Sequence, residues 1–341
     1  MLTCGKKDGI ISTMNKDKVT GLFLGTYLGD ALGMPVENWS KEKIQKTYDR
    51  ITTLLVPEKR SWFNGEKAGT PTDDWQLTKS VAEALIYSDP LNMKFQVKFH
   101  IKALEESTSG WGKSTKESVI KLKMGTHWKK SGNPTGAGSG IVMKIAPLGA
   151  FAATKIESLK KCKCFATKLA KMTHKTVLAM SSGLVQMMAI HHCIKSKELD
   201  INKFAKLVLK TAIESERKCI KPRKDKCKDK LSDRLIELPR HVNFPEQRII
   251  DEFGGGSCYV YNSLPFAYMF FVQNPHSIDA LFNVINAGGD TDTNGSIVGA
   301  LLGSLNGMAV FPEDLLERIP DNYYQEIVNI SEKFSERFGF K

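Results

Sequence analysis

The sequence contains no run of about eighteen apolar residues, which is the length that a helix needs to cross a membrane. Its first residues, MLTCGKKDGIISTMNKDK, include no apolar core and so do not read as a signal peptide. No unit of about 30–50 residues repeats along the chain, which argues against a solenoid. Few segments alternate apolar and polar residues, and helical periods dominate. We therefore expect an all-α protein without a membrane partner.

The chain also lacks the residue patterns that bind zinc. Its seven cysteines form no CxxC pair, and its seven histidines include no HExxH motif. An odd number of cysteines without a signal peptide indicates reduced thiols rather than a disulfide framework. The sequence thus predicts an intracellular protein, located in the cytoplasm or the nucleus.

Arginine is scarce, because only nine of the 49 basic residues are arginine, and the net charge of +12 comes from lysine. Such an excess of lysine is typical of a solvated surface. It would also attract a polyanion such as a nucleic acid. Because neither a nucleic-acid motif nor interleaved aromatic residues accompany the lysines, we do not expect a nucleic-acid partner.

The sequence does contain two oxygen-rich segments, each at the start of a predicted helix. Thr72–Asp74 opens a segment whose apolar residues recur every four positions, typical of an amphipathic helix. Asp290–Thr293 reads Asp-Thr-Asp-Thr and precedes an apolar run. Carboxylates are favoured at a helix N-terminus, so one such cluster alone indicates an ordinary helix start. If both clusters met in a central cleft, as we expect, their carboxylates would repel one another unless cations held them together.

Glycine recurs at every fourth position in two predicted helices, from Gly21 to Gly33 and from Gly295 to Gly303. This spacing places the glycines on one face of each helix, where another backbone can approach closely. We expect both helices to pack tightly against other helices, with each other as one option.

Two glycine-rich loops are candidates for binding an anion. Residues 132–140, GNPTGAGSG, allow backbone N–H groups to face an anion at the start of the next helix, although a simple turn is the plainer interpretation. Residues 107–115, STSGWGKST, match a Walker A loop only in part, because Ser107 stands where glycine is required and no strand precedes it. We therefore reject a P-loop.

Taken together, these segments resemble the ADP-ribosylglycohydrolases, a family that includes dinitrogenase-reductase-activating glycohydrolase. Any single block would be a weak signal, but the matching blocks occur in family order between about residue 18 and about residue 310. They are GLFLGTYLGDALGMPVE, TDDWQLTKSVAEAL, GWGKST, GAGSGIVMKIAPLGAF, MTHKTVLAMSSGLVQMMAI, GGGSCYVYNSLPFAYMF and GGDTDTNGSIVGALLGSLNG.

The resemblance implies a single compact domain of orthogonal helices over residues 17–341, with a central cleft for two metal ions. We expect residues 1–16 to form a flexible tail. Residues 215–245 are the most polar part of the chain. We expect them to form an exposed insert between helices, ordered or not, rather than a nuclear-import signal. The expected oligomeric state is a monomer.

Six residues match the metal ligands of the family. They are Thr72, Asp73, Asp74, Asp290, Asp292 and Thr293. Carboxylate and hydroxyl oxygens suit two Mg²⁺ or Mn²⁺ ions rather than zinc, and we expect Asp292 to bridge them. Glu37 lies in a loop, where a glutamate is usually only solvated, but the resemblance places it near the scissile bond. The resemblance thus makes the four aspartates and Glu37 the candidate catalytic residues.

The resemblance also implies contacts with ADP-ribose. The matching residues are Gly138, Ser139, Gly140, Lys144, His174 and Tyr259. The family pattern in the loop that cradles the diphosphate is Gly-Asn-Gly with a later arginine, whereas this chain has Ser139 and Lys144. Lysine cannot make the planar bidentate contact of arginine, so the affinity or the substrate preference is expected to differ. His174 as a cap and Tyr259 as a packing residue remain open alternatives.

The leading interpretation is a metal-dependent hydrolase that cleaves the glycosidic or ester bond at C1″ of ADP-ribose attached to a protein side chain. Its expected partners are ADP-ribose and an ADP-ribosylated protein. The alternative is a family member that binds ADP-ribose without turnover, or a crystallin-like structural protein. Linkages to arginine, serine, an acetyl ester, a nucleic-acid base or poly(ADP-ribose) all fit the sequence equally.

Overall fold

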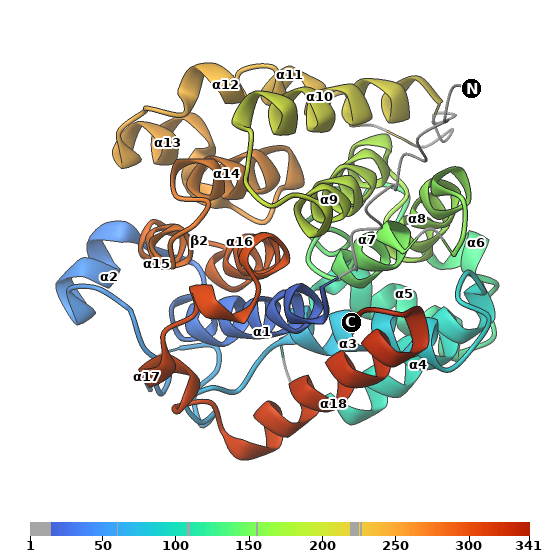
Figure 1. Ribbon diagram of the computed structural model, residues 1–341, viewed down its shortest axis with the longest axis horizontal. Helices are drawn as coiled ribbons and strands as arrows, with labels where there is room; N and C mark the ends of the chain where they lie inside the picture. Colours follow the sequence, from blue (N-terminus) through green and yellow to red (C-terminus); the bar gives the residue numbers. More distant parts are fainter. Residues whose placement is uncertain (1–14, 60, 108–109, 155, 219–224, 226) are drawn as a thin grey trace, which may run out of the picture.

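Two helices with glycine stripes lie against each other at the centre of the protein, α1 (Lys16–Gly33) and α16 (Thr291–Asn306) (Figure 1). A Cβ atom built on Gly25 would lie 2.0 Å from the carbonyl oxygen of Gly299. Only glycine permits this contact between two backbones. The predicted close packing is therefore confirmed, and each of the two helices is the partner of the other.

The computed structural model describes residues 15–59, 61–107, 110–154, 156–218, 225 and 227–341. In these residues, helices are the only regular structure apart from two short strands, β1 (Trp39–Ser40) and β2 (Gly288–Gly289), which pair antiparallel. The predicted all-α class is confirmed. The other elements are α2 (Lys41–Tyr48), α3 (Asp73–Ile86), α4 (Met93–Glu106), α5 (Lys113–Lys123), α6 (Trp128–Ser131), α7 (Ala146–Ala153), α8 (Leu159–Thr173), α9 (Val177–Lys195), α10 (Ile201–Lys218), α11 (Leu231–Leu235), α12 (Leu238–His241), α13 (Glu246–Glu252), α14 (Val260–Gln273), α15 (Asp279–Asn286), α17 (Glu313–Leu316) and α18 (Asp321–Phe338), with short 3₁₀ turns at Met34–Val36, Gly254–Gly256 and Met308–Val310.

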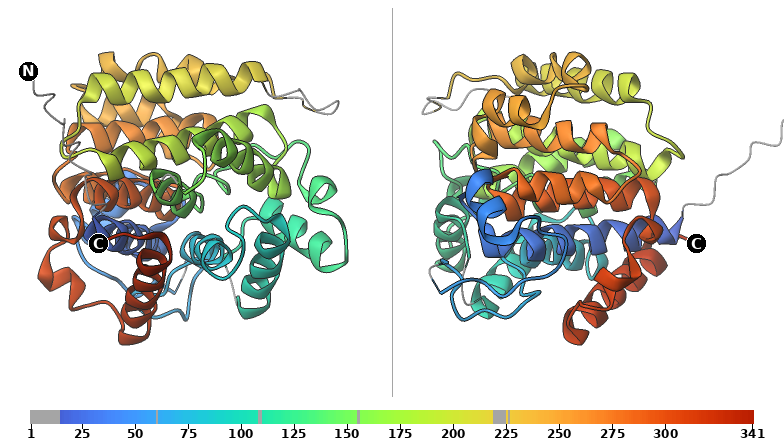
Figure 2. Two further views of the ribbon diagram at one scale, coloured as in Figure 1. Left: turned by 45° about the vertical axis from the view of Figure 1, so that its right-hand side comes forward. Right: turned by 90° about the vertical axis from the view of Figure 1, so that its left-hand side faces the viewer.

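The helices stack in layers around the central pair (Figures 1 and 2). In Figure 1, α14 and α9 lie above the pair, and α10 to α13 form the outermost layer above them. On the lower side of the pair, α3 and α18 pack against α1. The starts of α3 and α16 lie close together, because Asp74 in the first turn of α3 contacts Thr293 in the first turn of α16.

A buried aromatic cluster joins α1, α3 and α18. The ring of Phe23 lies edge-on to Trp75, with centroids 6.4 Å apart, and edge-on to Phe334 at 5.6 Å. Nε1 of Trp75 also donates a hydrogen bond of 2.7 Å to Glu326. Each aromatic pair contributes about 0.5–1.5 kcal/mol beyond its burial. These contacts fix the start of α3, and with it the oxygen-rich segment Thr72–Asp74.

α9 is long and apolar enough to cross a membrane, and it is the one such helix in the described residues. Most of it is buried inside the protein, where it packs against α7, α10 and α16. A helix that is apolar on all sides is typical of the core of a large domain as well as of a membrane. Burial within the helix stack accounts for its composition.

The insert expected over residues 215–245 contains helices where it is described. α10 continues to Lys218, and Leu231 and Leu235 of α11 are fully buried. Their spacing of four positions places both on the inner face of α11. This helical spacing is hard to recognise in the sequence because charged residues surround it. Residues 219–224 and 226 lie outside the described residues. The predicted N-terminal tail also lies outside them as far as residue 14, and α1 begins at Lys16.

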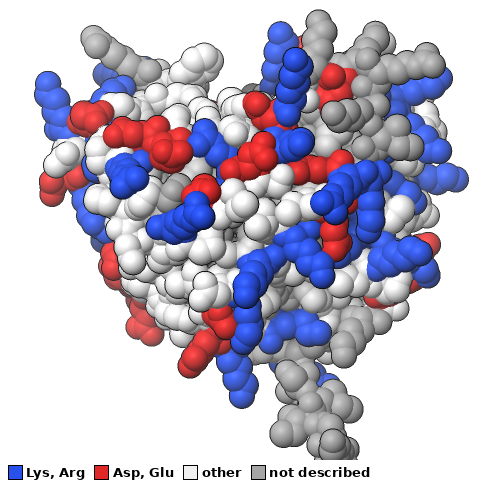
Figure 3. All heavy atoms as spheres, turned by 90° about the horizontal axis from the view of Figure 1, so that it is seen from above, with Lys and Arg blue, Asp and Glu red and all other residues white. Residues whose placement is uncertain are grey.

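Basic and acidic side chains are interspersed on the face above α10 to α13 (Figure 3). Lysine and arginine are more numerous on the right half of this view, and acidic side chains lie among them. This distribution fits the solvated, lysine-rich surface that the net charge of +12 predicts.

Candidate active site

The first oxygen cluster lies at the N-terminus of α3. Thr72 caps the helix, and its hydroxyl oxygen accepts a hydrogen bond of 3.5 Å from the N–H of Asp74. The N–H groups of Thr72 and Trp75 donate to the buried carboxylate of Asp30 on α1, at 2.9 and 2.8 Å. Asp73 and Asp74 therefore project from a fixed first turn, and both side chains are buried.

The second cluster lies at the start of α16, where β2 turns the chain sharply. Gly288 and Gly289 adopt positive φ angles of 83° and 84°. A Cβ atom on Gly289 would lie 2.0 Å from the carbonyl oxygen of Gly255, so glycine is required there. The turn places Asp290 directly before α16 and Asp292 in its first turn.

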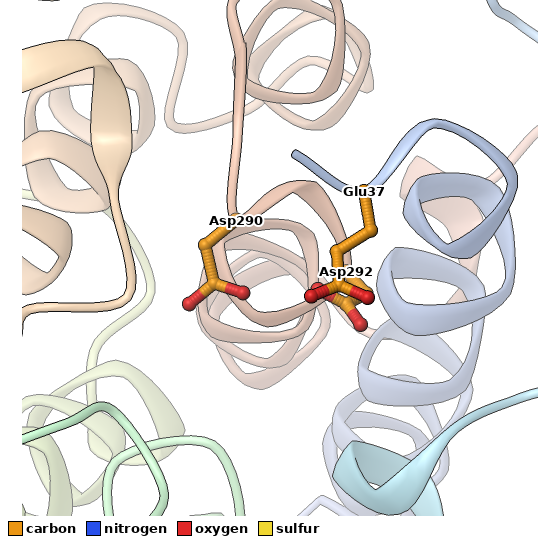
Figure 4. A group of neighbouring side chains, drawn as sticks. All are labelled: Glu37, Asp290 and Asp292. Atoms are coloured by element: carbon orange, nitrogen blue, oxygen red, sulfur yellow. The ribbon is translucent and has the colours of Figure 1, made fainter. Parts of the chain in front are cut away.

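The pairing of β1 with β2 brings Glu37 to the same place. The N–H of Asn38 donates to the carbonyl oxygen of Gly289 at 2.8 Å, and the Asn38 side chain donates to Oε1 of Glu37 at 3.0 Å. In Figure 4, Glu37 points from the loop after α1 toward Asp292, and Asp290 lies to one side. One carboxylate oxygen from each of these three residues lies within 4.8 Å of the others.

The two clusters contact each other directly. The Thr72 hydroxyl lies 3.4 Å from Oδ2 of Asp292, and the Thr293 hydroxyl lies 3.3 Å from Oδ2 of Asp74. The structure therefore brings together the six residues predicted to bind metal, with Glu37 beside them.

Burial and mutual repulsion make this cluster unfavourable without cations. Repulsion by Asp292, followed by burial, raises the pKa of Glu37 to about 9. Burial, followed by repulsion from Asp292, raises the pKa of Asp73 to about 7 and places the pKa values of Asp74 and Asp290 well above the usual range for aspartate. A group of carboxylates that repel one another in this way is stabilised by bound cations.

The donor atoms fit Mg²⁺ or Mn²⁺. Oδ1 of Asp74 is buried without a hydrogen-bond partner in the described part of the chain, and an ion beside it would satisfy it. The other donors that meet here are carboxylate and hydroxyl oxygens, the hard ligands that these two ions prefer. Residues on both α3 and α16 would hold the ions.

The glycine loop adjoins the acidic cluster. The Ser139 hydroxyl donates to Oδ2 of Asp290 at 3.1 Å, and the Ser139 N–H donates to the carbonyl oxygen of Cys258 at 3.0 Å. The Thr176 hydroxyl donates to the carbonyl oxygen of Gly136 at 2.8 Å. The loop is thus fixed at Gly136 and at Ser139, and Ser139 connects it to a predicted metal ligand.

His174 packs against the same loop. A Cβ atom on Gly140 would lie 2.7 Å from Cε1 of His174. Nδ1 of His174 lies 3.0 Å from the Thr173 hydroxyl. Burial, and then the charge of Lys144, lowers the pKa of His174 to about 3, so the ring is neutral. His174 can offer a ring nitrogen to a ligand without adding charge.

A cavity of about 460 Å³ opens over the cluster, within the range of about 300–1,000 Å³ that small-molecule sites occupy. Its lining comprises Glu37, Asp73, Asp74, Gly110, Gly112, Lys113, Ser114, Thr115, Asn133, Thr135, Gly136, Ala137, Gly138, Ser139, Gly140, Met143, His174, Cys258, Asp290, Asp292 and Thr293. A larger groove of about 610 Å³ lies between α8, α9 and α10, but lysine and apolar residues dominate its lining. The chemistry therefore favours the smaller cavity as the active site.

Two of the predicted ligand contacts do not line this cavity. Lys144 is fully buried, its ammonium group has no hydrogen-bond partner in the described residues, and its charge acts on Asp73 and Asp74. Tyr259 pairs with Gly138 through the backbone, and its hydroxyl donates to Asp229 at 2.5 Å and contacts Sγ of Cys227 at 3.4 Å. The contacts of both side chains with ADP-ribose remain predictions, and in this structure each side chain has other surroundings.

Two contributions to the site were not predicted from the sequence. The segment around Gly112, which does not form a P-loop, contributes to the acidic site instead. The backbone N–H of Gly112 donates to Oδ2 of Asp73 at 3.3 Å, and Lys113 lines the cavity. Asp30 was overlooked although it stands within an apolar, glycine-rich helix. A charge in such a surrounding is costly unless it is paired, and that cost is the signal that could have identified it.

Comparisons with known proteins agree with this geometry. A family model described as ADP-ribosylglycohydrolase matches residues 12–340. The chain belongs to the ADP-ribosylglycohydrolase family. The resemblance seen in the ordered sequence blocks is thereby confirmed.

Relatives of the chain extend over nearly its whole length. It is 27% identical over 317 residues to an uncharacterized protein of Archaeoglobus fulgidus, covering 91% of this chain and 94% of that protein. It is 20% identical over 311 residues to the ADP-ribosyl-[dinitrogen reductase] glycohydrolase of Rhodospirillum rubrum, covering 91% and 93%. It is 22% identical over 320 residues to the human ADP-ribosylhydrolase ARH3, covering 86% of each.

A solved structure shares the fold. The structure titled ADP-ribosylglycohydrolase-related protein complex superposes with a TM-score of 0.67 at 21% identity. The match covers 95% of this chain and 99% of that chain.

Proposed function

We propose that this protein is a metal-dependent hydrolase that releases ADP-ribose from a modified protein side chain by breaking the bond at C1″. The observation that carries the proposal is the meeting of the α3 and α16 oxygen clusters at one cavity, beside a glycine loop and a neutral histidine. Family membership supports the reaction class, and the names of two relatives specify ADP-ribosyl hydrolysis.

The metal site of this proposal takes two Mg²⁺ or Mn²⁺ ions. Thr72, Asp73 and Asp74 would hold them from the α3 side, and Asp290, Asp292 and Thr293 from the α16 side. When bound, the ions supply positive charge that orients the distal ribose and stabilises the charge developing as the C1″ bond breaks. Asp292 lies 3.4 Å from the Thr72 hydroxyl and within 4.8 Å of carboxylate oxygens of Glu37 and Asp290, so it would hold an ion from the centre of the cluster.

Glu37 is the residue best placed to move a proton. It lines the cavity and is partly exposed, whereas the aspartates around it are buried. The Asn38 side chain orients it through the hydrogen bond to Oε1. Cations bound by the neighbouring aspartates would offset the repulsion that raises the pKa of Glu37, so its carboxylate could act as a base. In the proposed mechanism, this carboxylate accepts a proton from the water that attacks C1″, an oxocarbenium-type centre, and the proton passes to the side chain that leaves as the C1″ bond breaks.

The glycine loop would bind the diphosphate. The N–H groups of Gly138 and Gly140 donate to no group in the described part of the chain, and both glycines line the cavity. Free backbone N–H groups in a glycine-rich loop are typical ligands of phosphate oxygens. The Ser139 hydroxyl is already engaged with Asp290, so Ser139 links the diphosphate loop to the metal cluster.

The proposal is tested by incubating the purified protein with peptides that carry ADP-ribose on arginine or serine, and with acetyl-ADP-ribose. Free ADP-ribose is quantified by mass spectrometry in Mg²⁺, in Mn²⁺ and in EDTA. We expect release from at least one substrate that requires metal and is lost in the double variant Asp290→Ala and Asp292→Ala. Metal-dependent binding of ADP-ribose without release from any substrate would instead favour a binding protein, the alternative that Ser139 and the buried Lys144 leave in place.

A further inference from the structure

We propose that Asp30 is a positioning residue that sets the distance between the two metal-binding clusters. The inference rests on the proposed function in that it takes these clusters as the metal site. Asp30 does not line the cavity and would not touch the ions or the substrate. It would act through the backbone of the segment that carries Thr72, Asp73 and Asp74.

The carboxylate of Asp30 accepts hydrogen bonds from two backbone N–H groups at the N-terminus of α3. Both of its oxygens lie 2.9 Å from the N–H of Thr72, and Oδ2 also accepts from the N–H of Trp75 at 2.8 Å. Thr72 and Trp75 flank Asp73 and Asp74 in the sequence. These hydrogen bonds therefore fix both the position and the rotation of the turn from which the Asp73 and Asp74 carboxylates project.

The same part of α1 also holds α16. A Cβ atom on Gly33 would lie 2.4 Å from the backbone nitrogen of Asp292. The Thr291 hydroxyl donates to the carbonyl oxygen of Gly33 at 2.8 Å. Asp30 lies one turn of helix before Gly33, so a single stretch of α1 fixes the segments that carry both clusters.

The position is costly for a carboxylate. Asp30 is fully buried, and its charge is repelled by Asp292. A buried charge is destabilising unless hydrogen bonds compensate it, and here the compensating donors are the free N–H groups at the start of α3. An apolar residue would pack in α1 without this cost. The contact with α3 therefore explains a carboxyl group at this position, because its Oδ2 accepts from both N–H groups and its Oδ1 accepts from Thr72 as well.

The test compares three variants by calorimetric titration with Mn²⁺ and by thermal unfolding in Mn²⁺ and in EDTA. Asp30→Asn retains the shape but replaces one acceptor oxygen by a donor. Asp30→Glu retains the charge and moves it by one methylene. Ser296→Ala is the matched control, because it removes a buried hydrogen bond of 3.1 Å between α16 and Thr26 of α1 without touching α3.

We expect Asp30→Asn and Asp30→Glu to weaken Mn²⁺ binding about 10- to 100-fold, the usual effect of losing a residue that orients metal ligands. Ser296→Ala should lower the melting temperature and leave the Mn²⁺ affinity within about twofold. Wild-type affinity in a folded Asp30→Asn variant would overturn the inference. If Asp30→Glu kept the wild-type Mn²⁺ affinity while Asp30→Asn lost it, the inference would also be overturned. The affinity would then depend on the charge at this position and not on where the carboxylate lies.

Amide hydrogen exchange on the wild-type protein decides the question if both Asp30 variants fail to fold. The inference predicts that the Thr72 and Trp75 amides exchange slowly even in EDTA, since Asp30 holds them before metal binds. Rapid exchange of both amides in EDTA would contradict it. These readouts need no hydrolysis, so a protein that binds Mn²⁺ but releases no ADP-ribose would refute the proposed function and leave the role of Asp30 intact.

Discussion

The hydroxyl of Thr293 on α16 lies 3.3 Å from Oδ2 of Asp74 on α3, although 219 positions separate the two residues in the sequence. Both residues lie in the first turn of their helices. The N-termini of α3 and α16 therefore point at one place, and the positive ends of the two helix dipoles favour negative charge there. The carboxylates that gather at this point exceed what two helix ends can offset, which makes the site suited to cations.

Metal removal is expected to destabilise the protein. Because the carboxylates repel one another when no cation is present, Mn²⁺ should raise the melting temperature and EDTA should lower it. At about 100 times its dissociation constant, a bound ion adds about 2.7 kcal/mol to the free energy of unfolding. Differential scanning fluorimetry over a range of Mn²⁺ concentrations measures this effect. An equal shift in the variant Asp290→Ala and Asp292→Ala would place the ion elsewhere.

Replacing Asp74 by asparagine should have opposite effects with and without metal. Asp74→Asn removes one of the repelling charges, so the free energy of unfolding in EDTA should rise by on the order of 1 kcal/mol. The same change removes a metal ligand, so the additional stability in Mn²⁺ should largely disappear. Urea unfolding in the two conditions measures both effects. Asp314→Asn, at an exposed position, serves as a control and should change neither by more than about 0.5 kcal/mol.

The contact between α1 and α16 should not tolerate a methyl group. Gly25→Ala would place a carbon 2.0 Å from the carbonyl oxygen of Gly299, so the helices must separate. We expect the free energy of unfolding to fall by about 1–3 kcal/mol or more. Gly112→Ala is the matched control for stability, because nothing lies within 4 Å of its added carbon and its φ of −57° suits alanine. Equal losses in both variants, measured by urea unfolding, would contradict the account.

His174 and Tyr259 should differ in their effect on ADP-ribose affinity. The His174 ring lines the cavity, whereas the Tyr259 hydroxyl is bonded to Asp229 outside it. The loss of one hydrogen bond worth about 1.4 kcal/mol raises a dissociation constant about tenfold. His174→Ala should therefore weaken ADP-ribose binding about tenfold. Tyr259→Phe should leave the affinity within about threefold. Calorimetric titration of ADP-ribose in Mg²⁺ gives both values, and the reverse order would show that the ligand lies on the Tyr259 side.

Much of this architecture could be predicted from the sequence. Helical periods gave the all-α class, and the four-residue glycine spacing gave the close packing of α1. The gathering of Thr72–Asp74 with Asp290–Thr293 followed from the resemblance, and the structure shows their hydroxyls and carboxylates in contact. These features depend on local periodicity and on ordered motifs, which a sequence displays directly.

The direction in which single side chains point could not be predicted. Met143 lines the cavity while Lys144, the next residue, is buried behind it, and spacing alone does not distinguish the two. The partner of Tyr259 is Asp229, in a segment whose charges suggested an exposed insert. The role of Asp30 depends on the N–H groups of Thr72 and Trp75, which lie 42 and 45 positions away in the sequence. Each of these placements depends on tertiary contacts.

Anomalous diffraction from crystals grown with Mn²⁺ and ADP-ribose tests the central claim most directly. The account predicts manganese peaks enclosed by the oxygens of Thr72, Asp73, Asp74, Asp290, Asp292 and Thr293, with the distal ribose over them and the diphosphate against Gly138 and Gly140. Manganese bound elsewhere, or ADP-ribose bound with no manganese between α3 and α16, would contradict it.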